Sequence, residues 1–135
     1  MQPQYWSIDL LPGLKLPEQR LLKANGINDT KELLSRAHDL QSKQALANKL
    51  KLNSKSVSKW VALADLARVP SVGCQYCGIL LHTGIISVSQ LAQTPFDRLH
   101  HHVLRLQAAT LQRKLSPPVE QVKKWVDEAK LLQKS

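Results

Sequence analysis

Two cysteines and a row of histidines are the side chains in this sequence best suited to metal or redox chemistry. Cys74 and Cys77 form a C-x-x-C pair, His82 follows them, and three consecutive histidines occupy positions 100–102. Thiolates and imidazoles bind zinc, and C-x-x-C pairs also serve thiol–disulfide exchange. A zinc site normally shows a second compact ligand pair, whereas consecutive histidines on a predicted helix point in different directions. No βαβ pattern surrounds the cysteines, so we expect them to pack against a neighbouring helix, and we expect no metal and no cofactor.

The remaining residues offer no arrangement typical of catalysis. There is no phosphate-binding glycine string and no serine–histidine–acid arrangement, and the 10 acidic residues are scattered. We therefore expect a protein that is not an enzyme and that has no small-molecule substrate. Arg98 and Arg105 flank the three histidines, and this group could strengthen anion binding below about pH 6.5, where an imidazole becomes charged. An exposed helical face without a ligand is the simpler interpretation.

Two short stretches resemble the apolar-Pro-Gly-apolar-Gly turn of the helix-hairpin-helix motif: LPGLK at 11–15 and VPSVG at 69–73. In such a turn the N–H groups at a helix N-terminus meet a phosphate, and glycine lets the backbone come close. The resemblance implies binding to the DNA backbone without sequence preference. Each copy departs from the motif, because Lys15 replaces the second glycine of the first hairpin and Ser71 replaces the first glycine of the second. Phosphate-binding hairpins and purely structural turns both remain open.

The first hairpin is the better nucleic-acid candidate because cations surround it. Its turn contains Gly13, Leu14 and Lys15, and the helix that follows adds Arg20 and Lys23. The N–H groups of the turn would donate to a phosphate, and the three cationic side chains would supply charge. These five residues are the predicted nucleic-acid contacts.

The second hairpin lies in a long run without charge. Residues 69–96 contain no Lys, Arg, Asp or Glu. Domain interiors and the cores of protein interfaces are both depleted in charged side chains. The position of this run in the middle of the chain favours the interior, and a partner-facing or self-associating patch is the alternative.

The two hairpins belong to a repeated unit. They are offset by 58 residues (69 − 11), and the segments around Trp60 and Trp125 match at an offset of 65 (125 − 60). We expect one pseudo-symmetric all-α domain of seven or eight short helices, because no segment alternates as a strand does. It would consist of a leader over 1–10, a first half over 11–68 and a second half over 69–135. Both tryptophans should be core residues, since they lie on apolar helical faces.

Local signals agree between the two copies. Gly26 and Gly84 each follow a predicted helix and should end it in a left-handed conformation. Asp29 and Ser87 each precede the next helix, with Glu or Gln three residues on, as in a capping box. The cap chemistry is therefore kept although the residues differ.

Two further stretches, WVALADLARVP at 60–70 and GCQYCG at 73–78, carry a resemblance to a known family. From about Asp9 to Leu132 the chain is similar to a helix-hairpin-helix-related family of uncharacterised proteins, abundant in cyanobacteria. The resemblance implies the fold. It implies little about function, because the family has no agreed activity.

Composition narrows the choice of partner. The chain has 135 residues, 19 of them Lys or Arg and 10 Asp or Glu, which gives a net charge of +9 and a pI of about 9.8. Such a charge favours polyanions or acidic protein surfaces. No signal peptide or membrane-spanning stretch is evident, so we expect a cytoplasmic protein. The first hypothesis is sequence-independent nucleic-acid binding; the alternative is a protein-interaction adaptor that uses the uncharged second hairpin or the basic face.

Overall fold

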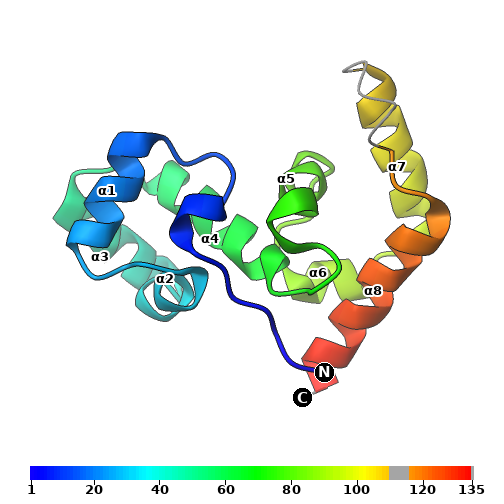
Figure 1. Cartoon of the computed structure of the whole chain (residues 1–135), viewed down its shortest axis with the longest axis horizontal. Helices are drawn as coiled ribbons and strands as arrows, with labels where there is room; N and C mark the ends of the chain where they lie inside the picture. The colour runs from blue at the N-terminus through cyan, green and yellow to red at the C-terminus, as the bar shows by residue number, and fades with distance from the viewer. Residues whose placement is uncertain (110–115, 135) are drawn as a thin grey trace.

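The computed structural model describes residues 1–109 and 116–134, and these residues form eight α-helices and one 3-10 turn. The prediction of an all-α fold is confirmed. The helices expected after Asp29 and Ser87 begin at Thr30 and Val88, whereas the helix expected around Lys43–Leu50 begins at Leu40. The 3-10 turn is η1 (Ile8–Leu10), and the α-helices are α1 (Leu16–Ala24), α2 (Thr30–Arg36), α3 (Leu40–Leu50), α4 (Ser54–Ala67), α5 (Gly73–His82), α6 (Val88–Gln93), α7 (Phe96–Ala109) and α8 (Val119–Lys134). Figure 1 shows α1–α3 gathered at one end of α4 and α5–α8 at the other.

The predicted helix boundaries rest on caps that the structure contains. The side chain of Asp29 accepts the N–H of Glu32 at 2.8 Å, and that of Ser87 accepts the N–H of Gln90 at 3.0 Å. The φ angles of the two glycines that end the preceding helices are +82° and +95°, in the left-handed region predicted for them. One cap was not predicted: Asp39 accepts the N–H of Ser42 and starts α3 earlier than expected.

The leader crosses the junction between the two halves. Trp6 exchanges hydrogen bonds with Thr30, and its indole N–H donates to the carbonyl of Ala67 at 2.7 Å. The ring lies against Gly73, where an added Cβ would meet Trp6 Cζ2 at 3.0 Å. Ile8 is fully buried. The leader therefore joins α2, α4 and α5 to one another.

The core runs through both halves along α4 and α8. Trp60 on α4 is 2% exposed and Trp125 on α8 is fully buried, as predicted. Hairpin 2, residues 69–73, connects α4 directly to α5, whereas hairpin 1, residues 11–15, follows only the short η1 turn. Hairpin 1 thus departs from the expected motif by having no α-helix before it. Within the described ranges, no helix has the length and apolar character needed to cross a bilayer.

Candidate nucleic-acid interface

Hairpin 2 is covered by side chains of α8. The N–H of Ser71 donates to Oε1 of Glu128 at 2.8 Å, and Glu128 is only 7% exposed. The carbonyl of Ser71 accepts the indole N–H of Trp125 at 3.2 Å and the amide of Gln121 at 3.4 Å. A buried carboxylate of the chain itself therefore satisfies the hairpin N–H that a phosphate would need, and α8 blocks access to it.

Hairpin 1 presents its backbone to solvent. Gly13 is exposed and has a φ of +84°, whereas the side chain of Leu14 is buried beneath the turn. The N–H of Lys15 donates to Oε1 of Glu18 at 2.9 Å. No side chain of the described residues accepts the N–H of Gly13 or of Leu14. One of the three turn N–H groups is thus bound within the chain, and the other two are not held by any side chain.

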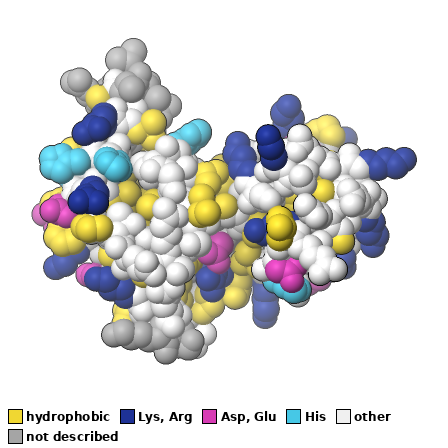
Figure 2. Space-filling model, turned by 180° about the vertical axis from the view of Figure 1, so that it is seen from behind, with side chains coloured by type: hydrophobic (Ala, Val, Ile, Leu, Met, Phe, Trp, Pro, Cys, Tyr) yellow, Lys and Arg dark blue, Asp and Glu magenta, His cyan; other side chains and the backbone are white. Residues whose placement is uncertain are grey.

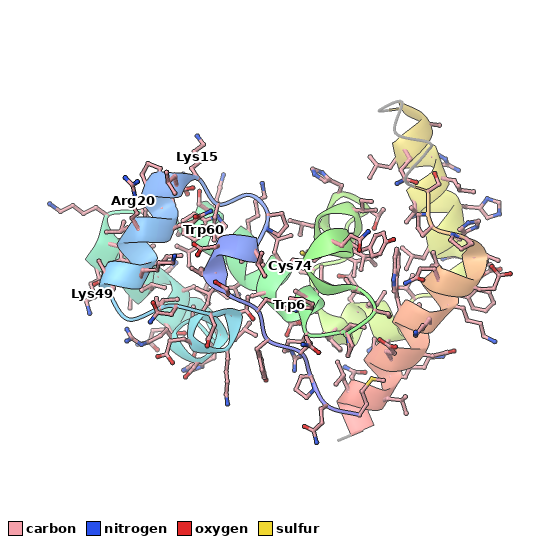
Figure 3. The ribbon with its side chains drawn as sticks, in the orientation of Figure 1. Trp6, Lys15, Arg20, Lys49, Trp60 and Cys74 are labelled. Carbon is pink, nitrogen blue, oxygen red and sulfur yellow. The ribbon has the colours of Figure 1, made fainter. Side chains whose placement is uncertain are left out.

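The three cationic side chains predicted around hairpin 1 differ in whether they form an ion pair. Lys23 forms an ion pair with Asp9 at 2.6 Å, so its charge is largely compensated. Lys15 and Arg20 are exposed and have no ion pair among the described residues. Figure 3 shows Lys15 above the start of α1 and Arg20 on α1 itself.

A fourth cation reaches hairpin 1 from α4. Lys59 Nζ lies 3.8 Å, and Leu63 Cδ1 3.7 Å, from the position that a Cβ would take on Gly13. Lys59 was not among the predicted contacts, because no local sequence pattern connects it to a turn 46 residues earlier (59 − 13).

Lys59 also belongs to an acid-free segment that was overlooked. Residues 40–64 contain five lysines and no Asp or Glu, and four of the five lysines are exposed. The segment covers α3 and most of α4, at the end of the molecule that carries α1. Exposed charges of one sign that are close together create a potential that attracts polyanions. Lys15, Arg20 and the four exposed lysines of this segment place several cations at this end of the molecule.

Cys77 is buried and Cys74 is half-buried, and neither thiol is in a reactive environment. Burial raises the pKa of Cys74 to about 11 and, with added repulsion from Cys74, that of Cys77 to about 12. Cys77 is fully buried. Since thiolates are the reactive form, both thiols are poor nucleophiles near neutral pH. The described residues contain no group of three or more His, Cys, Asp or Glu that could hold a metal ion.

The histidines of α7 lie beside two arginines. His101, His102, Arg98 and Arg105 line a shallow depression of about 460 Å³, with Asp97 at its edge. Two of the three predicted histidines and both arginines line this depression, whereas His100 does not, and anion binding by the group stays a prediction.

The uncharged run over 69–96 lies partly in the interior. Its buried members include Val69, Cys77, Leu80 and Leu91. Two large apolar side chains of the run are exposed, Ile86 at 60% and Phe96 at 37%.

Comparison with known proteins gives one match. A family model described as a domain of unknown function (DUF4332) covers residues 12–132. No curated protein and no solved structure gives a significant match. The chain therefore belongs to the DUF4332 family.

Proposed function

We propose that this DUF4332 protein is a non-enzymatic module that binds the phosphate backbone of nucleic acid without sequence preference. The observation that carries the proposal is the cluster of Lys15, Arg20 and Lys59 around hairpin 1. All three lack an ion-pair partner among the described residues. Backbone N–H groups at the turn and cations around it are the two devices that proteins use to hold phosphates.

We also propose that the halves are tandem helix-hairpin-helix-like repeats of which only the first binds. Leu63 of α4 lies on Gly13, and Glu128 of α8 lies on Ser71. The helix positions are 65 residues apart (128 − 63) and the hairpin positions 58 apart (71 − 13), which are the offsets of the sequence repeat. A leucine cannot accept a hydrogen bond as a carboxylate does, which leaves the N–H groups of Gly13 and Leu14 available to a ligand.

The proposed location is the cytoplasm. Cys74 and Cys77 are free thiols despite their closeness in sequence. Free thiols persist in reducing compartments, where nucleic acid is also accessible.

Binding should be weak and dominated by charge. Sequence-independent contacts to phosphates give dissociation constants of about 1–100 µM at physiological salt. Each neutralised phosphate releases counterions, so affinity should fall steeply as salt is raised.

The test is an anisotropy titration with labelled duplex DNA, single-stranded DNA and RNA of unrelated sequences. Lys15→Glu with Arg20→Glu should weaken binding about tenfold or more and reduce the slope of log affinity against log salt by about two. Lys124→Glu with Lys130→Glu is the matched control, because it removes the same charge from exposed positions on α8. Absence of binding at low salt contradicts the proposal. Equal losses of nucleic-acid affinity in the two double variants would show diffuse electrostatic attraction without a hairpin site.

A further inference from the structure

A groove about 670 Å³ in volume lies where the two halves meet. Its walls come from α2, the outer face of α4, and the segment from the end of α5 to the start of α6. Figure 2 shows hydrophobic side chains exposed in the hollow between the two lobes, with Lys and Arg on the lobe of the first half. The groove adjoins hairpin 1, because Lys59 lines the groove and also lies beside Gly13, whereas Lys15 and Arg20 do not line it.

One face of α4 forms the floor along almost the whole helix. Lys55, Ser58, Ala62, Asp65 and Arg68 line the groove, and their spacing of three or four residues is that of one helical stripe. At 1.5 Å per residue this stripe is roughly 20 Å long, enough for about 13 residues of a second helix. The small side chains at its centre, Ser58 and Ala62, permit the close approach of helix axes that packing requires.

The sides of the groove are apolar. Leu34 of α2 and Leu81 of α5 are half-buried, and Ile86, beyond α5, is 60% exposed. Exposed apolar side chains that converge in a concave surface are typical of sites that receive an apolar partner.

The groove carries more positive than negative charge. Asp65 is the only acidic side chain that lines it, and both of its oxygens are already engaged: Oδ1 accepts from Arg68 at 2.8 Å and Oδ2 accepts the N–H of Val88 at 2.8 Å. Lys43 and Lys55 line the opposite end and have no carboxylate within ion-pair distance among the described residues. An occupant that complements this groove carries negative charge at the lysine end.

We propose that the groove is a docking site for an amphipathic helix of a partner protein, with a stripe of Leu or Ile facing Ala62 and Ile86 and with Asp or Glu facing Lys43 and Lys55. The helix-in-groove mode matches the length, the small residues and the apolar sides. A second copy of this chain is disfavoured by its net charge of +9. Nucleic acid is disfavoured because Tyr5 is the one aromatic side chain in the lining, whereas unpaired bases stack on aromatic platforms.

The test uses a labelled synthetic peptide of about 18 residues, helical and amphipathic, with one leucine stripe flanked by glutamates. Anisotropy should show saturable binding, and a scrambled peptide of the same composition should bind about tenfold more weakly, because only the amphipathic order presents both features together. Lys43→Glu with Lys55→Glu should weaken binding about tenfold, and Ile86→Ser, at an exposed position, should weaken it severalfold.

The controls separate this site from the hairpin site. Lys15→Glu with Arg20→Glu should leave peptide affinity within about twofold, as should Lys124→Glu with Lys130→Glu, and unchanged melting curves show that each variant is folded. The inference is wrong if the scrambled peptide binds equally well or if the Lys124 and Lys130 pair matters as much as the Lys43 and Lys55 pair. It is also wrong if duplex DNA displaces the peptide and the groove pair lowers DNA affinity by the same factor, since nucleic acid then occupies the groove.

Discussion

Gly73 is constrained both by its backbone and by its neighbour. Its φ is +54°, and an added Cβ would lie 3.0 Å from the Trp6 ring. Gly73→Ala should therefore cost about 1–2 kcal/mol for the left-handed backbone and a further amount for displacing the indole. Urea denaturation of the variant measures the sum.

Gly84→Ala is the matched control for that measurement. Gly84 has a φ of +95° but no atom within 4 Å of the Cβ position, so its replacement carries the backbone cost alone. The difference between the two variants isolates the contact with Trp6. Equal losses of unfolding free energy in the two variants would mean that the Trp6 ring moves aside at no cost. The leader would then be loosely packed.

The raised pKa of Cys77 predicts a dependence of stability on pH. Burial lifts this pKa to about 12, so the thiol stays protonated in the folded protein while it ionises in the unfolded chain at lower pH. The contribution to stability is therefore full below the unfolded pKa of about 9 and is lost as the pH rises toward 12. Between pH 8 and about 10.5, Cys77→Ala should show a smaller fall in unfolding free energy than the original chain. Parallel curves for the two proteins would contradict the assigned burial.

At the scale of elements, Glu128 connects α8 to hairpin 2. Its carboxylate accepts the N–H of Ser71, a bond between residues 57 positions apart. Glu128→Ala should cost about 1–3 kcal/mol because it leaves that N–H unsatisfied in a buried place. Glu128→Gln keeps an acceptor and should cost less. Thermal or urea denaturation ranks the two variants, and an equal loss from both would show that packing, rather than the hydrogen bond, holds the hairpin.

The elements that sequence predicted well are those whose signals are local. The caps at Asp29 and Ser87 lie three residues from their partners, and the helices they start were placed correctly. The cap at Asp39 was overlooked because its partner, Ser42, falls outside the usual Glu or Gln pattern.

The candidate site depended on contacts that a local pattern does not contain. Lys59 reaches Gly13 across 46 residues (59 − 13), and Glu128 reaches Ser71 across 57. Such pairs depend on how the helices pack. The sequence repeat predicted two similar halves but not their individual side-chain contacts. The sequence located both turns and favoured the first as the nucleic-acid candidate because of its cations, but it did not predict that Glu128 covers the second.

At the scale of the molecule, the leader contacts both halves, in addition to the hydrogen bond from Val88 to Asp65 and the packing of α5 on α4. Gln4 and Trp6 bond to the carbonyls of Arg68 and Ala67 at the end of α4, and Trp6 also bonds to Thr30 of α2. Deleting residues 1–8 should therefore reduce amide-exchange protection in α2 and at the start of α5, with little change along α8. Unaltered protection around Thr30 and Gly73 would contradict this role.

The contacts of the leader can form only after much of the chain has been synthesised on the ribosome. Trp6 is synthesised before Ala67 and Gly73, the residues that it contacts, which follow 61 and 67 residues later (67 − 6 and 73 − 6). The surface that the Trp6 indole contacts cannot form until α4 and the start of α5 have left the exit tunnel. Cutting the gene at the boundary between the halves, after residue 68, would separate Trp6 from Gly73, so that neither fragment retains the junction that the intact chain builds.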